Sequence, residues 1–425
     1  MKTFVNPDRK DWKFICSRPE DDHSEIENRV LEIIRKVQAY GDAALLEFSE
    51  KFDGVKLHQL KVTEEEIRNA GNAVSADLKR AIAMAKENIH RFHEAQKESP
   101  VKIETRSGVE VWRKSVAIEK VGFYIPGGTA PLFSSILMLA VPASIAGVKE
   151  MILCTPPGKD GEVHPAVLYT ASVCGIKHIF KTGGAQAIAA MAYGTETIPA
   201  VYKIFGPGNR YVTFAKQYVG RKDVAIDMPA GPSEVAVFTD GTGNPDFIAA
   251  DLLSQAEHGT DSQVVLVSTN KEIMEEVLEA LHKQKESLPR KSLVEGALSE
   301  SRMVYFGNAD TAMEFLNEYA PEHLIIASSQ PDQYEDKIVN AGSVFLGNFS
   351  PEAAGDYASG TNHTLPTNGY AKAYSGVSLD TFVKKITFQK ISREGLSQLS
   401  KAIEMMADAE GLDAHKNAVT IRLKQ

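Results

Sequence analysis

Gln255 and His258 are spaced so that they could hold one metal ion. They lie late in the segment 246–259, whose apolar residues favour a helix. Because residues three apart share a helical face, an amide oxygen and an imidazole nitrogen could contact the same cation. Histidine with oxygen donors suits zinc or a similar metal. The alternative is an ordinary polar pair at a helix end, which is solvated or caps the following turn.

Glu322 and His323 are adjacent, between a helical stretch that ends at Ala320 and a strand predicted to begin at Leu324. A histidine with a pKa of about 6.5 exchanges protons readily around neutral pH. A carboxylate beside it at the boundary of two elements is well placed for proton transfer. On spacing alone, however, an exposed loop pair is the simpler interpretation.

Two further constellations lie near the C-terminus. The segment 350–363 is dense in small and polar residues, and such a loop is costly to bury unless its polar groups find partners, which favours a ligand-binding role. Asp356 and His363 are its titratable candidates. Glu410 and His415 bracket a Gly-Leu-Asp-Ala turn, which is unusual in a small terminal segment but proves nothing alone.

Three glycine-containing loops follow predicted strands, at 124–128, 183–186 and 205–209. Parallel sheets bind ligands beyond the carboxyl ends of their strands, and glycine lets backbone N–H groups approach a phosphate closely. None of the loops completes the G-x-G-x-x-G pattern, because Gly206 and Gly208 lack the third glycine. Tight turns and a dinucleotide site therefore both remain open.

Cys154 ends an apolar run, where a thiolate nucleophile is conceivable. A cysteine that ends an apolar strand is more often buried and unreactive, so packing is the preferred interpretation.

The first hundred residues are predicted to be helical up to about Ser99. Thr63 and Glu66 form a capping-box pattern, in which each side chain satisfies the other's backbone N–H. An earlier helix should stop at Asp53-Gly54, and the alternation over 101–115 predicts a hairpin. The apolar face of that earlier helix is formed by Ile26, Val30, Ile33, Ile34 and Val37.

From Val121 onward, short β-branched runs alternate with glycine-rich loops and helical segments, which is typical of parallel βα units. This predicts an α/β fold with two Rossmann-like parallel-sheet domains and small helical N- and C-terminal appendages. The first strand series is predicted at 122–125, 151–155, 178–181 and 202–205. The second is predicted at 235–238, 264–268, 303–306, 324–327 and 343–346.

Because the first series lies inside the chain, it is expected to be an inserted domain whose host lies on either side. The predicted division is a helical arm at 1–20, a discontinuous main domain at 21–121 and 229–376, an inserted domain at 122–228, and a helical tail at 377–425.

The composition of the 425 residues is that of a globular protein, with 43% hydrophobic and 24% charged residues. A net charge of -9 argues against a nucleic-acid or anionic-membrane partner. The N-terminus lacks the apolar stretch of a signal peptide, and three widely spaced cysteines suit a reducing compartment, so a cytoplasmic location is expected. The charge-free stretch 121–148 is long enough for a membrane span, but its prolines and glycines favour a buried strand, loop and helix.

In this order, the motifs resemble the histidinol dehydrogenase family over nearly the whole chain. The resemblance is carried by 123–128 (FYIPGG), 183–187 (GGAQA), 205–209 (FGPGN), 228–234 (MPAGPSE), 251–259 (DLLSQAEHG), 320–324 (APEHL), 355–363 (GDYASGTNH) and 414–419 (AHKNAV).

The resemblance implies a zinc site and an NAD site. Zinc would be held by Gln255, His258, Asp356 and His415, the last from the partner subunit of a homodimer, and the substrate's imidazole and amine would complete its shell. His323 matches the general base, and Glu322 matches the residue that helps a water attack the aldehyde. Ser233, Glu322 and Glu410 match further substrate contacts, as do the ligands and His323, and the inserted domain would bind NAD through Tyr124, Gln186 and Asn209.

The implied activity is the NAD-dependent oxidation of L-histidinol through L-histidinal to L-histidine, the last step of histidine biosynthesis. By the same resemblance Cys154 is not a nucleophile. One alternative is a zinc- and NAD-dependent dehydrogenase of the same fold that acts on another small alcohol, such as a sulfonated diol. Such an enzyme need not keep every group that grips an imidazole and an amine, whereas this chain keeps Glu410 and His415. Another alternative is a zinc-binding structural protein without catalysis.

Overall fold

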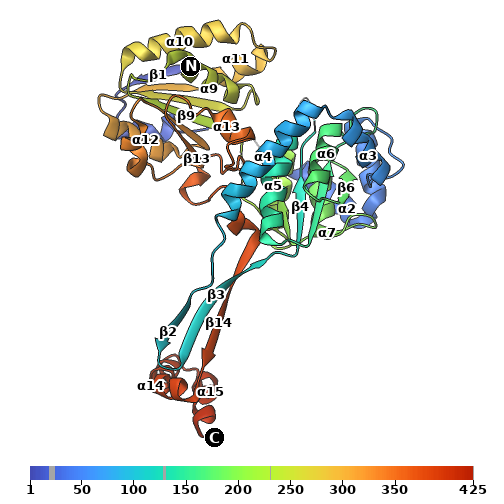
Figure 1. The fold of residues 1–425 in the computed structure, drawn as a ribbon, viewed down its shortest axis with the longest axis vertical. Coiled ribbons are helices and arrows are strands. Elements are labelled where there is room, and N and C mark those ends of the chain that lie inside the picture. Colours follow the sequence, from blue (N-terminus) through green and yellow to red (C-terminus); the bar gives the residue numbers. More distant parts are fainter. Residues whose placement is uncertain (19–23, 128–130, 230, 425) are drawn as a thin grey trace.

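A computed structural model of the chain describes residues 1–18, 24–127, 131–229 and 231–424. Two parallel sheets and one antiparallel sheet organise these residues (Figure 1). The antiparallel sheet projects as an arm from the two parallel-sheet domains (Figure 1). The predicted α/β fold with two parallel-sheet domains is therefore confirmed.

The first parallel sheet has the strand order β6-β5-β4-β7-β8. This order reverses direction next to β4, which is where Rossmann-type sheets bind ligands. Its strands are β4 (Lys120–Tyr124), β5 (Glu150–Thr155), β6 (His178–Lys181), β7 (Lys203–Phe205) and β8 (Ala225–Ile226). The helices between them are α5 (Phe133–Ala146), α6 (Pro165–Val173), α7 (Gly184–Tyr193) and α8 (Arg210–Gly220).

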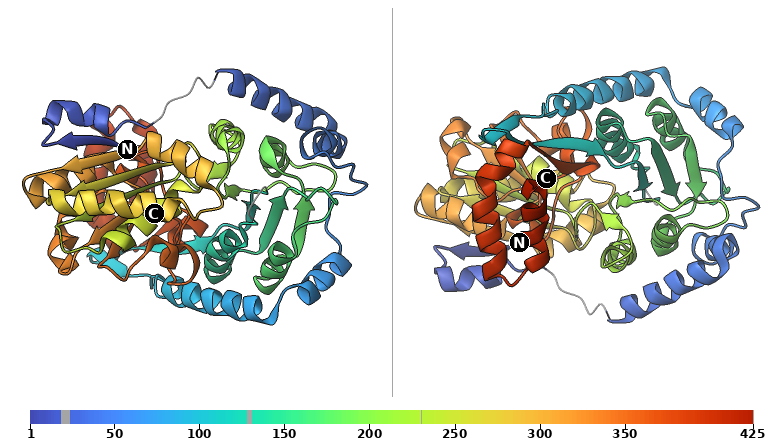
Figure 2. Two further views of the ribbon diagram at one scale, coloured as in Figure 1. Left: turned by 90° about the horizontal axis from the view of Figure 1, so that it is seen from above. Right: turned by 90° about the horizontal axis from the view of Figure 1, so that it is seen from below.

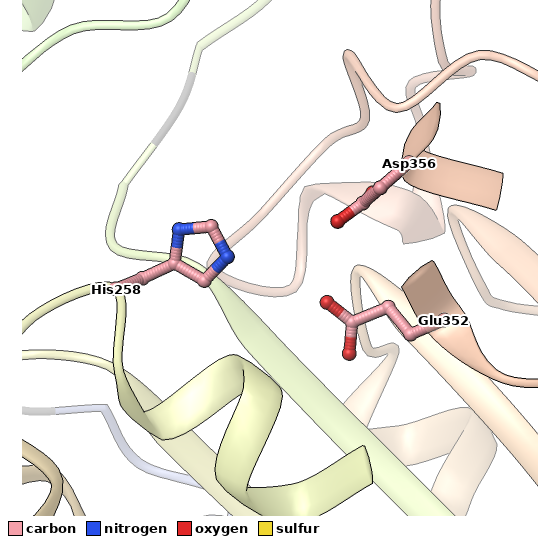
Figure 3. Close-up of side chains that lie close together, drawn as sticks. All are labelled: His258, Glu352 and Asp356. Carbon is pink, nitrogen blue, oxygen red and sulfur yellow. The ribbon is translucent and has the colours of Figure 1, made fainter. Parts of the chain in front are cut away.

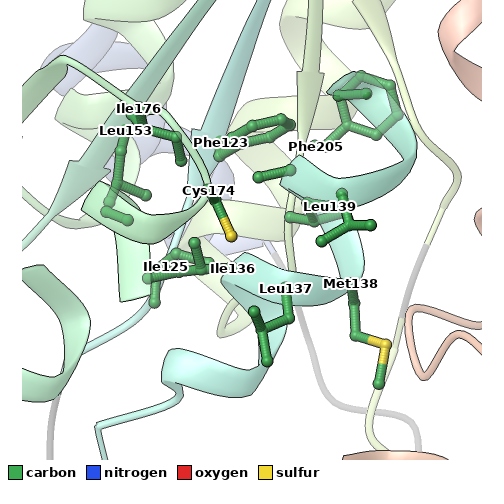
Figure 4. Packing of buried hydrophobic residues seen from close by; sticks show 14 of the residues in the cluster. Phe123, Ile125, Ile136, Leu137, Met138, Leu139, Leu153, Cys174, Ile176 and Phe205 are labelled. Carbon is green, nitrogen blue, oxygen red and sulfur yellow. The ribbon is translucent and has the colours of Figure 1, made fainter. Parts of the chain in front are cut away.

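The charge-free stretch 121–148 consists of β4 and α5, which together supply much of one apolar core (Figure 4). Its Gly128 and the two following residues lie outside the described residues. Every residue of α5 from Ser134 to Ala143 is buried, so the absence of charge reflects burial inside the protein. None of the helices in the described ranges is both long and apolar enough to cross a membrane.

The second parallel sheet has the order β1-β11-β10-β9-β12-β13. All residues of its central strands β9 (Glu234–Thr239) and β10 (Gln263–Ser268) are buried, as expected for a parallel sheet covered on both faces. The other strands are β1 (Lys2–Val5), β11 (Arg302–Tyr305), β12 (His323–Ala327) and β13 (Ser343–Leu346). The associated helices are α1 (Arg9–Ile15), α9 (Pro245–Ala256), α10 (Lys271–Lys285), α11 (Lys291–Ser299), α12 (Ala309–Tyr319), η2 (Pro331–Lys337) and α13 (Glu352–Tyr357).

All the strands predicted in the two series are present within a residue or two of their expected bounds. The predicted helical arm at 1–20 is only partly helical, because β1 pairs in parallel with β11 at the edge of the second sheet. Strand β1 is largely exposed, so its short sequence lacks the apolar alternation that would have identified it.

The expected domain division differs from the packing on the N-terminal side. The helices α2 (Ser24–Phe48), α3 (Glu64–Ala73) and α4 (Ala76–Glu94) pack mainly against helices of the first sheet, and α4 also contacts residues 358–362 after α13. Figure 2 shows α2 and α4 on opposite sides of the β4–β8 sheet. Val30, Ile34 and Val37 of α2 belong to the same apolar core as that sheet. The apolar face of α2 is therefore buried against the first sheet's domain and not against residues 229–376.

The capping box and the helix end that the sequence predicted in this region are both present. Thr63 and Glu66 form the capping box at the start of α3. The preceding helix, α2, continues into a short π-helical turn, η1 (Ser49–Asp53), and Gly54 follows with a left-handed φ of 70°. A glycine tolerates this conformation without strain, which explains why the helix stops there.

The arm is built from β2 (Lys102–Arg106), β3 (Val109–Ala117) and β14 (Val383–Ile391), with α14 (Arg393–Ala409) and α15 (Asp413–Lys424) at its tip. The hairpin expected over 101–115 is confirmed as β2 and β3. The tail 377–425 is not wholly helical, because β14 pairs antiparallel with β3 along its whole length. Most of β14 is exposed, so its sequence has no regular alternation of apolar and polar residues that would predict a strand. Short 3₁₀ helices, η3 (Tyr370–Lys372) and η4 (Leu379–Phe382), lead into it.

Phe382 anchors the base of the arm to the first sheet. Its ring is fully buried and stacks on Phe205, with ring centroids 4.4 Å apart. It also meets Phe123 edge-on at 6.4 Å. These contacts join the C-terminal strand to a core formed mainly by residues 121–205.

We expect Phe382→Ala to lower the free energy of unfolding by about 3–5 kcal/mol, because a large buried ring is removed from a core that cannot fully collapse. Urea denaturation followed by circular dichroism measures this. The control Phe14→Ala removes a ring that is 64% exposed and should change stability by no more than about 0.5 kcal/mol. Equal losses in the two variants would contradict the anchoring role.

Candidate functional site

The candidate site lies at the amino-terminal edge of the second sheet. Glu234 begins β9, His323 begins β12, and α9 ends with Gln255 and Ala256 just before β10. Parallel sheets usually bind ligands at the opposite, carboxyl edge. The residues that could do chemistry here are therefore placed by the loops that enter the strands.

His258, Glu352 and Asp356 form a cluster that could hold a metal ion. Each offers one ligand atom, and these atoms lie within 4.8 Å of one another. Figure 3 shows the three side chains pointing toward a common point, His258 from the end of α9 and the two carboxylates from α13. His258 is exposed, Asp356 is partly buried and Glu352 is buried. The predicted metal-type residues His258 and Asp356 are thus brought together.

Burial raises the pKa of these carboxyl groups. Desolvation raises the pKa of Asp356 to about 6 and that of neighbouring Asp251 to about 7. The pKa of Glu352 is raised well above its usual value, first by desolvation and then by Asp356, Glu322 and Asp251 nearby. A bound cation reverses this balance, because it stabilises the ionised carboxylates.

Gln255 is fully buried and its carboxamide lies between Glu352 and the backbone of Glu234. With the nitrogen toward the carboxylate, it donates to the two Glu352 oxygens at 2.5 and 3.2 Å, and its oxygen accepts from the Glu234 N–H at 3.0 Å. In this orientation both ends of the carboxamide are paired. The fit to a metal ion comes from His258, Glu352 and Asp356, which supply the nitrogen and oxygen donors that zinc takes.

Glu322 and His323 are both buried, so the interpretation as an exposed loop pair is wrong. Glu322 accepts a hydrogen bond of 2.9 Å from the Glu234 N–H. The Nδ1 atom of His323 lies 3.4 Å from the Glu234 carbonyl oxygen, and its Nε2 atom lies 3.8 Å from Asp356 Oδ1. Within the described residues, this Nε2 atom has no hydrogen-bond partner.

Burial also sets the charge of His323. Desolvation lowers the pKa of His323 to about 3, so the imidazole is neutral at pH 7 and can accept a proton. Because the Glu234 carbonyl can only accept, a hydrogen bond there places the ring proton on Nδ1 and leaves Nε2 with its lone pair. The pKa of Glu322 is raised by desolvation, which favours its protonated form before a ligand binds.

His363 connects the site to the first sheet's domain. Its Nδ1 atom lies 2.9 Å from the backbone oxygen of Asp356, and its Nε2 atom lies 3.0 Å from the Ser135 hydroxyl of α5. Desolvation lowers the pKa of His363 to about 4. These contacts give it a bridging position between the domains. Ser233 lies partly buried, directly before Glu234.

Glu410 and His415 do not join this cluster within one chain. Both are exposed and lie near the junction of α14 and α15, at the tip of the arm (Figure 1). The metal cluster lies with α9 and α13, near the opposite end of the molecule (Figure 1). A role for Glu410 and His415 in this site therefore requires a second chain.

Tyr124, Gln186 and Asn209 lie at the carboxyl edge of the first sheet. Tyr124 ends β4, is buried, and its hydroxyl accepts from the Gly184 N–H at 3.2 Å. Gln186 is buried in the first turn of α7, and Asn209 caps α8 by accepting from the Val212 N–H. Three candidate cofactor residues thus surround the starts of two helices.

The glycines of these loops are needed for close backbone packing. Gly206 has a φ of 123°, and a Cβ atom there would lie 2.0 Å from the Tyr124 carbonyl oxygen. The Cβ of a residue at Gly183 would meet Pro156 at 2.7 Å. The tight-turn interpretation is correct for Gly206, whose backbone packs closely on that of Tyr124. Cys154 is fully buried and desolvation raises the pKa of its thiol, so its interpretation as packing is confirmed.

Sequence reasoning missed Glu352, Asp251 and Glu234. The segment 350–363 was expected to be a loop, but α13 within it places Glu352 and Asp356 one helical turn apart on the same face. That spacing of four was the available signal for Glu352. Nothing local identifies Glu234, since it is the first residue of a buried strand.

Comparisons with known proteins agree over the whole chain. The sequence profile described as histidinol dehydrogenase matches residues 16–423. Histidinol dehydrogenase from Bacteroides thetaiotaomicron is 56% identical over 423 residues, covering 100% of this chain and 99% of that protein. The histidinol dehydrogenase of Vibrio vulnificus strain CMCP6 is 52% identical, covering 93% of this chain and 91% of the relative.

A solved structure is equally similar. The crystal structure of histidinol dehydrogenase from Elizabethkingia anophelis has a TM-score of 0.98 and 54% identity, covering 100% of this chain and 98% of that one. Sequence and fold agree from end to end, and the chain belongs to the histidinol dehydrogenase family.

Proposed function

We propose that this chain oxidises L-histidinol through L-histidinal to L-histidine with NAD as the oxidant, the last step of histidine biosynthesis. The observation that carries the proposal is the position of the buried, neutral His323 beside a cluster of metal-type donors, in a chain similar to histidinol dehydrogenases along its whole length. A neutral imidazole has a free lone pair for a hydroxyl proton, and ionised Asp356 and Glu322 nearby would stabilise the imidazolium that forms. The donors beside it could hold a metal ion, which would bind a substrate through its nitrogen atoms.

The metal is proposed to be zinc, held by Gln255, His258, Asp356 and the partner subunit's His415. The support in this chain is the convergence of His258 and Asp356, and the buried Gln255 carboxamide, which contacts Glu352 of the same cluster. Bound zinc supplies a template that orients the substrate's imidazole and amine. Glu410 of the partner subunit is proposed to contact the substrate as well, as is this chain's Ser233.

NAD is proposed to lie at the carboxyl edge of the first sheet, against Tyr124, Gln186 and Asn209. The support is that these three residues lie at the starts of α7 and α8, beyond the carboxyl ends of β4, β6 and β7, where glycines allow close backbone packing. Bound NAD supplies the hydride acceptor for each oxidation.

The acid–base steps are assigned to His323 and Glu322. Nε2 of His323 accepts the hydroxyl proton, and the imidazolium that forms is stabilised by Asp356 and Glu322, whose oxygens lie 3.8 and 3.7 Å from the ring nitrogens. Glu322 assists a water that adds to the bound aldehyde. After the first proton has passed to solvent, His323 accepts a proton again in the second oxidation.

We expect His258→Ala to lose most of its zinc and its turnover, because a ligand is removed from the metal. Elemental analysis after dialysis, with a steady-state assay on the same sample, measures both. The control His282→Ala changes an exposed histidine on α10 and should retain full zinc. Full occupancy and normal turnover in His258→Ala would show that the metal lies elsewhere.

The position of His415 at the tip of the arm predicts that each active site needs two chains. Inactive His258→Ala and inactive His415→Ala subunits, mixed and exchanged, should regain activity, because each heterodimer contains one intact site. Random exchange limits the recovery to about one quarter of the wild-type activity. No recovery after verified exchange would mean that the site is completed within one chain.

His323→Asn keeps the approximate shape of the side chain but removes the titratable nitrogen, so turnover should fall roughly 100-fold or more. Zinc content should change little, because His323 is not a proposed ligand. In the unmodified enzyme each histidinol should give two NADH and one histidine, measured by absorbance and amino-acid analysis. One NADH with free aldehyde accumulating would contradict the two-step reaction, and near-normal turnover in His323→Asn would remove that residue from its role.

A further inference from the structure

A single residue outside the expected site, Glu234, contacts both proposed acid–base residues through its backbone. Its N–H donates to Glu322 at 2.9 Å, and its carbonyl oxygen lies 3.4 Å from Nδ1 of His323. The same N–H lies 3.0 Å from the Gln255 carboxamide oxygen in one orientation. The position of one residue's backbone therefore affects the orientation of three side chains of the site.

The side chain of Glu234 is held from the opposite side by Arg18. The guanidinium donates from Nε to Oε2 at 2.7 Å and from Nη2 to Oε1 at 3.0 Å, which is a two-pronged contact. The Glu234 carboxylate is 1% exposed and the Arg18 side chain 14%. The Tyr319 hydroxyl lies 3.3 Å from the same carboxylate. A buried carboxylate with this set of donors has one stable position.

Arg18 also contacts Tyr319, in the segment that leads to Glu322 and His323. Its Nη2 donates to the Tyr319 carbonyl at 2.7 Å, and its guanidinium lies 3.9 Å from the centre of the Tyr319 ring. Tyr319 ends α12, and Ala320 follows with a φ of 51°, a conformation that is unfavourable for alanine. This turn leads directly to Glu322 and His323. One guanidinium thus ties the start of β9 to the turn before β12.

We propose that Arg18 and Glu234 are a positioning pair that fixes the Glu234 peptide group, and through it the tautomer of His323 and the orientation of Glu322. The pair rests on the proposed role of His323 as the base. The Glu234 carbonyl holds the proton of the imidazole on Nδ1, so that Nε2 accepts the substrate proton. Neither side chain of the pair is proposed to touch the substrate or the metal. Arg18 follows α1, so through this contact the N-terminal segment would support the site without lining it.

The test compares Arg18→Gln, Glu234→Gln and the double variant in the full-length, zinc-loaded enzyme. Each single change should lower kcat about 10- to 100-fold, because a small misplacement of a base has an effect of that size. KM for histidinol and zinc per chain should stay within about 2-fold, since no proposed metal ligand is substituted and three of the four ligands remain in place. The double variant should be no slower than the worse single variant, because both act through one contact.

Two further variants distinguish positioning from stability. Arg18→Lys keeps the charge but not the two-pronged contact, so it should recover kcat only in part. It also carries the test if Arg18→Gln does not fold. Arg9→Gln is the matched control, because Arg9 pairs with Glu314 at an exposed position in the same N-terminal segment and should leave kcat unchanged.

Normal kcat in folded Arg18→Lys or Glu234→Gln would overturn the proposal. So would a loss of kcat matched by an equal loss of zinc, since the pair would then only stabilise the metal site. If His323→Asn were itself active, the base assignment would fail first. If His323→Asn is inactive while the Arg18 and Glu234 variants are normal, only the positioning role fails.

Discussion

The site depends on carboxyl groups that the fold removes from water. Asp251, Glu322, Glu352 and Asp356 are all largely buried, and their pKa values are raised because desolvation disfavours the ionised form. Among the described residues their ion-pair partners are histidines, not lysines or arginines. Such a cluster is costly unless a cation or a positively charged substrate group enters it. The fold therefore holds these groups ready for a ligand that supplies positive charge.

The candidate functional residues lie at opposite edges of the two parallel sheets. The first sheet offers the carboxyl edge of β4 and β7, where helix starts and glycines leave room for a phosphate-containing ligand. The second offers its amino edge, where Glu322 and His323 lie at the start of β12 beside Glu234 at the start of β9. His363 joins these two parts through Ser135 on one side and Asp356 on the other. The residues proposed for NAD and the proposed base thus lie in different domains.

The arm buries much less apolar surface than the two domains do. Its strands β3 and β14 pair over nine residues but bury little apolar surface, and α14 buries only Gly395 and Ala407. Exposed apolar residues on the arm and its tip include Ile103, Phe388, Met405, Met406 and Ile421. A segment that exposes such residues is stabilised further when it packs on another surface. This fits the proposed position of Glu410 and His415 in the site of a second subunit.

The sequence alone determined the strand series, the capping box of α3, the burial of β4 and most of α5 and, through its resemblance to a family, most of the residues proposed for the site. These follow from local periodicity and from motifs that are contiguous in the chain. Periodicity identifies an apolar face but not its partner, so the packing of α2 on the first sheet came only from the structure. The tertiary structure also decided the burial of Glu322 and His323 and the contact of Arg18 with Glu234, 216 residues away. Contacts over such separations have no local signal, because only the folded chain brings their partners together.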